Sequence, residues 1–123
     1  MPMGVLDDKV AIVTGSARGI GRATAELLSE HGAKVLINDL DTELAEQTAS
    51  DIAGETVVHG GDLTASGACD ELVQTAIDAW GKIDIIVNNA GYTIDGAIHK
   101  ITDDQFQRML DIHTVVPFRV IRA

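Results

Sequence analysis

Val10-Ala11-Ile12-Val13-Thr14-Gly15-Ser16-Ala17-Arg18-Gly19-Ile20-Gly21 is the stretch that decides the fold. Its first four residues are apolar, which is typical of a buried parallel strand. The glycines that follow allow a tight turn and a close approach of the backbone to a bound group. The amphipathic segment after them predicts a helix, whose first amides have no partner within the helix. A strand, glycine turn and helix in this order predict a phosphate-binding helix end.

The glycine spacing in this turn, G-x-x-x-G-x-G, separates it from other nucleotide motifs. A triphosphate-binding P-loop ends in Gly-Lys-Ser/Thr, whereas Arg22 and Ala23 follow Gly21 here. The turn therefore favours a dinucleotide over a nucleoside triphosphate. A purely structural tight turn is the alternative.

Strand and helix patterns alternate along the whole chain. Apolar runs predict strands at 9–13, 34–38, 55–59 and 83–87, and helical spacing predicts helices at 19–30, from about 41, from about 64 to 80, and from 102 to 123. Short connections between alternating elements predict an α/β fold with a parallel sheet covered by helices on both faces. We expect a Rossmann-type, doubly wound sheet with strand order 3-2-1-4, as one domain over residues 1–123.

Helical spacing also predicts which side chains face the core. The first helix is expected to bury Ile20, Ala23, Leu27 and Leu28. Thr102 and Gln105 form a predicted capping box at the start of the last helix, and Pro117 predicts a kink in it. The apolar stripe of that helix is predicted to contain Phe106, Met109, Leu110, Val120 and Ile121.

Composition limits the possible partners. The net charge of −10 argues against nucleic acid and anionic membranes as partners, because both require a basic surface. The single cysteine, Cys69, suits a reducing compartment. The residues from Met1 onward show no secretory leader, and no apolar run reaches membrane-spanning length, so we expect a cytoplasmic protein. The histidines do not cluster at metal-ligand spacings, so no metal site is expected.

Asp39 follows the second predicted strand, 18 positions after Gly21. A dinucleotide site uses a carboxylate about 20 residues after the glycines to bind the ribose hydroxyls. The same carboxylate would repel the 2′-phosphate of NADP, which favours NAD. Arg18 is a possible phosphate partner, and a solvated loop acid is the alternative interpretation of Asp39.

Two further loops end at the same edge of the predicted sheet. Asp62 could accept a hydrogen bond from the adenine amino group, with the Leu63 amide as a donor, or it could cap the helix that follows. Asn88 and Asn89 could tie neighbouring strands together, and Ala90 and Gly91 would leave room for a ribose. An ordinary Asn/Gly turn is the alternative.

The motifs Thr14-Gly-Ser-Ala-Arg-Gly-Ile-Gly21, Asp62 and Asn88-Asn-Ala-Gly91 resemble those of the classical short-chain dehydrogenase/reductase family. The resemblance extends over nearly the whole chain and is nearest to 3-oxoacyl-carrier-protein reductases and to hydroxyacyl or hydroxysteroid dehydrogenases. It implies NAD(P)-dependent interconversion of alcohols and ketones, with a small-molecule alcohol, ketone or acyl thioester as substrate. It also implies a homo-oligomer, a dimer or tetramer, that pairs through the segment 102–123. The cofactor-binding residues that the motifs and the resemblance indicate are Gly15, Ser16, Arg18, Gly19, Ile20, Gly21, Asp39, Leu40, Asp62, Leu63, Asn89, Ala90 and Gly91.

Two departures from the family pattern bear on catalysis. The family's Tyr-x-x-x-Lys motif is absent, since Gly96 stands four residues after Tyr92, the only tyrosine. The resemblance implies that the chain contains the cofactor-binding half of a family member. His113 occupies the position of the family's catalytic Asn, and it is either a proton-relay residue or a histidine packed on the apolar stripe. A non-catalytic dinucleotide-binding module and a fragment without independent function are the alternatives to an enzyme.

Overall fold

A four-stranded parallel sheet forms the centre of the protein. The structure is a computed structural model that describes residues 4–123. The segment predicted to contain no secretory leader begins at Met1, so its first three residues lie outside the described range. The strands are β1 (Val10–Val13), β2 (Lys34–Ile37), β3 (Thr56–Val58) and β4 (Ile85–Val87). They pair in the order β3-β2-β1-β4, which confirms the predicted topology.

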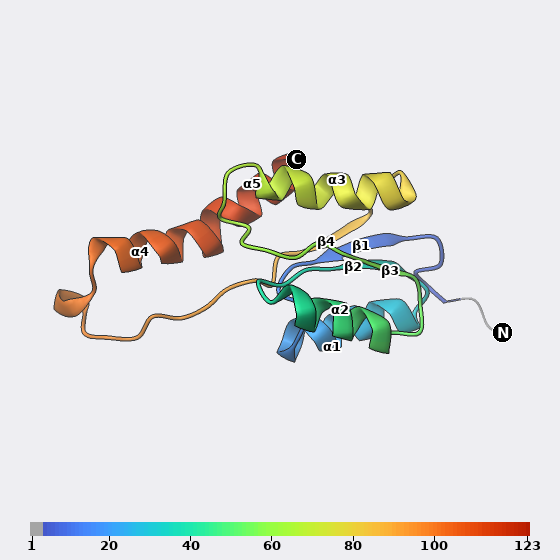
Figure 1. Ribbon diagram of the computed structural model, residues 1–123, viewed down its shortest axis with the longest axis horizontal. Helices are drawn as coiled ribbons and strands as arrows, with labels where there is room; N and C mark the ends of the chain where they lie inside the picture. Colours follow the sequence, from blue (N-terminus) through green and yellow to red (C-terminus); the bar gives the residue numbers. More distant parts are fainter. Residues whose placement is uncertain (1–3) are drawn as a thin grey trace.

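Helices cover both faces of this sheet (Figure 1). On one face lie α1 (Gly19–Glu30) and α2 (Thr42–Asp51), and on the other lie α3 (Ala68–Trp80) and α5 (Val116–Arg122). Because side chains alternate along a strand, Ala11 and Val13 join the core under α1 and α2, whereas Ile12 joins the core under α3 and α5. This double burial explains the unbroken apolar run of β1.

The face that α1 turns to the sheet differs from the predicted one. Its buried residues are Gly21 and Ala25, while Ile20 is 80% exposed and Leu27 is 55% exposed. A Cβ atom on Gly21 would collide with the carbonyl oxygen of Gly15, so the helix approaches β1 through its smallest residues. Of the four residues predicted to be buried, only Leu28 is partly buried, and the prediction was wrong for the other three. Helical spacing favours large apolar residues as the buried face, whereas glycine and alanine form it here.

The predicted last helix is divided into α4 (Asp103–Leu110), a π-helical turn η2 (Asp111–Val115) and α5. A short 3-10 helix, η1 (Ile98–Lys100), precedes α4. Thr102 and Gln105 form the predicted capping box. The α-helix is interrupted just before Pro117, which lacks an N–H group and whose ring would clash with the carbonyl of His113 four residues earlier.

The interruption changes which residues of this segment are buried. The core contains Ile112, Val116 and Val120, whereas Phe106 is 60% exposed and Ile121 is 67% exposed, so the predicted stripe was largely wrong. In Figure 1, α4 projects beyond the sheet, and none of its residues is buried. The wider turn of η2 shifts the register between α4 and α5.

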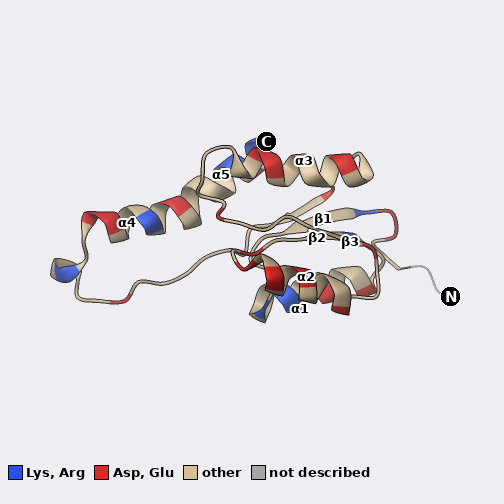
Figure 2. Cartoon of the chain, in the orientation of Figure 1, with Lys and Arg blue, Asp and Glu red and all other residues tan. Residues whose placement is uncertain are grey.

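Charge is distributed over both layers of helices. Figure 2 shows acidic residues on α2, α3 and α4, that is, on both sides of the sheet. Within residues 4–123, no helix is long and apolar enough to cross a membrane.

Candidate functional site

A cavity of about 550 Å³ lies where the loops after the parallel strands meet. Nine of the predicted cofactor-binding residues line it: Gly15, Arg18, Asp39, Leu40, Asp62, Leu63, Asn89, Ala90 and Gly91. Four others, Ser16, Gly19, Ile20 and Gly21, are outside the lining. The loops predicted to meet at one edge of the sheet therefore do converge.

Gly15 has a left-handed backbone conformation, with φ of +63°. A Cβ atom there would lie 2.9 Å from the Cα of Ala90, so a larger residue would force the turn away from the end of β4. Its amide donates to the Asn38 side chain (3.3 Å), and its carbonyl accepts from the Asn89 side chain (3.1 Å). Asn89 thus ties β4 to the glycine turn, as predicted, while Asn88 is exposed.

Ser16 is completely buried and does not line the cavity. Its hydroxyl donates to the Val13 carbonyl (2.7 Å), and its backbone amide donates to the Asn38 carbonyl (2.7 Å). The hydroxyl therefore stabilises the turn itself and is not available to a ligand in this arrangement.

The N-terminus of α1 is open. Its N-cap residue, Arg18, makes no side-chain capping bond, and the first amide bonded within the helix is that of Arg22, which donates to the Arg18 carbonyl. The preceding amides carry the positive end of the helix dipole, so this end can hold an anionic group. The Arg18 guanidinium lies 3.8 Å from the carboxylate of Asp41, and both side chains are more than half exposed.

Asp39 connects the cavity to the turn. One carboxylate oxygen accepts from the Ala17 amide (3.2 Å), and the other accepts from the Asp41 amide (3.2 Å). The carboxylate is half-buried and lines the cavity, which contradicts the interpretation of Asp39 as a freely solvated acid. Each oxygen retains a lone pair for a ribose hydroxyl.

Asp62 does not cap α3, because that helix begins only at Ala68, after an N-cap at Gly67. Instead, one oxygen of Asp62 accepts from both the amide (2.9 Å) and the hydroxyl (2.6 Å) of Thr64 in a local turn. The capping alternative was therefore wrong, as was the predicted helix start near Thr64. Leu63 is buried and lies between the cavity and the core under α3.

Two buried polar side chains, absent from the predicted set of site residues, support the cavity wall. The Asn38 amide group donates to the His59 carbonyl (2.8 Å) while its oxygen holds Gly15. The Thr14 hydroxyl oxygen accepts from the amides of Asn89 (3.0 Å) and Ala90 (2.9 Å). Their position in the sequence could have identified them as site residues, since each directly follows a buried apolar strand.

His113 is exposed, so the interpretation as a packed core histidine was wrong. Its Nε2 lies 2.8 Å from the Tyr92 carbonyl oxygen, and the rings of the two residues are 6.5 Å apart. It does not line the cavity, but a Cβ atom on Gly91, which does, would lie 2.5 Å from its Cε1. Among residues 4–123, no group of three or more potential metal ligands occurs.

Comparison with known proteins agrees with this geometry. Residues 9–123 match the family described as "short chain dehydrogenase". The mitochondrial borneol dehydrogenase of Lavandula x intermedia is 44% identical over 92% of this chain and 44% of its own length. The sorbitol dehydrogenase of Cereibacter sphaeroides is 42% identical over 88% of this chain and 42% of its own length.

A solved structure shows the same fold. The crystal structure of a short chain dehydrogenase from Mycobacterium avium superposes with a TM-score of 0.91 and 32% sequence identity, over 97% of this chain and 45% of that one. The chain thus spans less than half the length of each of these three proteins. The strand order, the glycine turn and these matches together show that the chain belongs to the short-chain dehydrogenase family.

Proposed function

We propose that this chain is the dinucleotide-binding part of an oxidoreductase that interconverts a secondary alcohol and a ketone with NAD. The observation that carries the proposal is the cavity that Asp39 lines together with Arg18, the N-cap residue at the open end of α1. An anion-binding helix end beside a ribose-binding carboxylate is the donor and acceptor set that a dinucleotide requires.

The residues of the cavity divide the binding of NAD between them. The amides at the start of α1 and the Arg18 guanidinium would bind the pyrophosphate, and Asp39 would accept from the adenosine ribose hydroxyls. Leu40, Asp62 and Leu63 would surround the adenine, while Asn89, Ala90 and Gly91 form the wall at the end of β4. The nicotinamide ring would supply the site that accepts or donates a hydride.

Asp39 also favours NAD over NADP. Its negative charge would oppose a 2′-phosphate on the same ribose, and Arg18, which could otherwise attract that phosphate, faces the carboxylate of Asp41. Titration of the chain with NADH and NADPH, followed by ligand fluorescence, tests the proposal. We expect tighter binding of NADH; tighter binding of NADPH would contradict the role of Asp39, and binding of neither would contradict the proposed function.

The substrate class rests on resemblance. The relatives are named for borneol, for sorbitol and, in Thauera aromatica, for a hydroxy(phenyl)methylsuccinyl-CoA thioester. We propose a small alcohol, ketone or acyl thioester, with a 3-oxoacyl thioester as the first substrate to test. A panel of these compounds assayed by NADH absorbance would identify it.

A dinucleotide-binding module without catalysis is the second candidate. Tyr92 is the only tyrosine, its hydroxyl donates to the Arg108 carbonyl (3.3 Å), and no lysine stands four residues after it. We expect the 123-residue chain to bind NADH without oxidising it in the presence of ketones. Measurable NADH oxidation above the rate without protein would contradict this expectation.

We also propose that copies of the chain associate in the cytoplasm. Phe106, Phe118 and Ile121 within the segment 102–123 are more than half exposed, and α4 has no buried residue. Exposed apolar residues on one segment are typical of an interface. Sedimentation velocity on the wild type and on Phe118→Asp would test it, with a smaller species expected for the variant.

A further inference from the structure

We propose that Thr48 and Arg22 are positioning residues that hold the glycine turn in its pyrophosphate-binding conformation. The inference rests on the proposed function, and it concerns residues that no motif assigns to the cofactor. Thr48 lies on α2 and Arg22 on α1, and neither lines the cavity. Both act through Ala17, in the middle of the turn.

Ala17 is held by side chains at both of its backbone polar groups. Its carbonyl accepts from the Thr48 hydroxyl (2.6 Å), and its amide donates to Asp39 (3.2 Å). Ala17 is 1% exposed and Thr48 is fully buried, so water cannot replace the Thr48 bond. The segment after β2 therefore fixes the turn after β1 from two directions.

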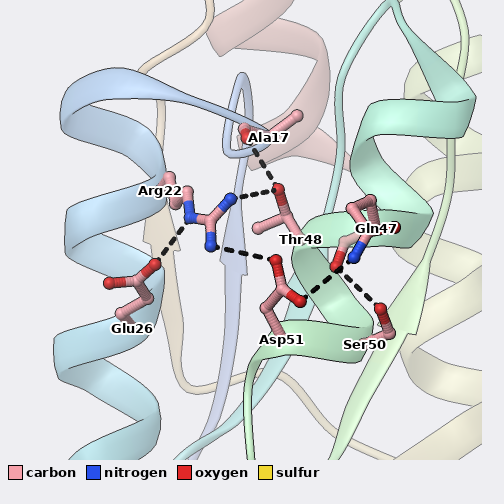
Figure 3. Close-up of polar contacts among 7 residues, drawn as sticks. All are labelled: Ala17, Arg22, Glu26, Gln47, Thr48, Ser50 and Asp51. Carbon is pink, nitrogen blue, oxygen red and sulfur yellow. Dashed lines mark hydrogen bonds and ion pairs between the residues drawn. The ribbon is translucent and has the colours of Figure 1, made fainter.

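Arg22 determines which way the Thr48 hydroxyl points. A hydroxyl has one proton to donate, and a guanidinium can only donate. The Nη1 of Arg22 lies 3.4 Å from the Thr48 oxygen, so the hydroxyl proton is left for the Ala17 carbonyl (Figure 3). The guanidinium thus orients the hydrogen bond from the Thr48 hydroxyl to the Ala17 carbonyl.

Acidic residues hold this guanidinium on two sides. Its Nε donates to Glu26 (2.6 Å), and its Nη2 donates to Asp51 (3.2 Å), as Figure 3 shows. Gln47 donates in turn to the second oxygen of Asp51 (3.1 Å). These bonds use the planar, forked geometry of the guanidinium and fix it between α1 and α2.

The Ala17 carbonyl can affect ligand binding because it shares a peptide group with the Arg18 amide. The Ala17 carbonyl and the Arg18 amide lie in one rigid plane, so a bond to the oxygen also fixes the direction of the Arg18 N–H. Arg18 is the N-cap of α1, at the open helix end. A turn ordered before binding avoids the entropy cost of ordering it on binding. The effect should fall on ligands that contain a pyrophosphate.

Calorimetric titration of Thr48→Val with ADP, NAD and adenosine tests the inference. We expect ADP and NAD to bind about tenfold more weakly than to the wild type, and adenosine to bind within about twofold. Thr48→Ser keeps the hydroxyl and should restore binding. Arg22→Met leaves Thr48 without its orienting donor and should weaken ADP binding about threefold. Thr75→Val removes a hydroxyl that bonds to the Glu71 carbonyl (2.8 Å) within α3 and serves as the matched control.

The results of these titrations distinguish a failure of the positioning role from a failure of the proposed function. Unchanged ADP binding by Thr48→Val, or equal losses for ADP and adenosine, would overturn the positioning role while leaving the proposed function intact. Failure of the folded wild type to bind ADP or NAD would overturn both. If Thr48→Val does not fold, as judged by circular dichroism, Arg22→Met decides alone, because the Arg22 side chain is 33% exposed and a methionine of similar length can replace it without opening the core.

Discussion

The Nε2 atom of His113 lies 2.8 Å from the carbonyl oxygen of Tyr92, so the π-helical turn η2 is joined to the start of the loop that follows Gly91. The Tyr92 hydroxyl donates to the Arg108 carbonyl on α4, which gives the same residue a second attachment to the helical segment. Two hydrogen bonds therefore fasten the start of the loop before α4, next to Gly91 in the cavity wall.

Replacement of His113 should loosen this loop. In His113→Ala the Tyr92 carbonyl loses its side-chain donor, and we expect the amides of residues 92–101 to exchange with solvent about fivefold faster. Hydrogen exchange measured by mass spectrometry checks this. His99→Ala, which removes an exposed histidine of η1, is the control, and equal exchange in the two variants would contradict the prediction.

Asp39→Asn should shift cofactor preference. The single amide oxygen can keep the bond to the Ala17 amide and gives up the one to the exposed Asp41 amide, whereas the charge that opposes a 2′-phosphate is gone. We expect the ratio of NADPH to NADH affinity to rise about tenfold, as measured by fluorescence titration. Asp78→Asn on α3 makes the same change in net charge, and a similar rise there would show that the effect is not local.

Asp84 should make the sheet sensitive to acid. The Val10 amide (2.9 Å) and then the Lys82 ammonium (3.0 Å) hold the pKa of Asp84 below its ordinary value. A lowered pKa in the folded state stabilises the protein above the pKa of the unfolded chain, about 3.9, and this contribution is lost as the pH falls through the folded value.

Asp84→Ala should therefore lower the urea midpoint at pH 7, and the loss should be smaller at pH 3, below the pKa of the unfolded chain, where the contribution of the carboxylate has begun to disappear. Asp95→Ala, in the exposed loop before α4, is the comparison variant. An equal loss from Asp84→Ala at both pH values would mean that the carboxylate charge contributes nothing.

Cys69 should be unreactive in the folded protein. It is 3% exposed, its thiol donates to the Leu63 carbonyl (3.3 Å), and burial raises its pKa, so the reactive thiolate is scarce. We expect labelling by a disulfide reagent at pH 8 to be about a hundredfold slower than in urea. Rapid labelling without urea would show that α3 opens readily from the sheet.

The sheet and the converging loops could be predicted because they depend on local signals. β1 is apolar along its whole length, and Gly15 and Asp39 follow strands at spacings with a direct physical reason. The capping box of Thr102 and Gln105 lies within four residues of sequence, so it could also be predicted.

Features set by packing between distant segments could not be predicted in the same way. Gly21 is buried because it meets the Gly15 carbonyl, a contact that helical spacing does not reveal. His113 is exposed because η2 shifts the helix register ahead of Pro117. Asn38 and Thr48 carry out their roles through bonds to Gly15 and Ala17, which become visible only when the turn is folded.

The projection of α4 beyond the sheet gives the molecule two levels of stability. The core opens only when the whole fold unfolds, whereas α4 and η1 bury no residue and can open as a local unit. Association of copies through α4 would suppress this local opening. The order of the Tyr92 attachment beside the cavity would then depend on protein concentration, and dilution alone would weaken the site before any strand came apart.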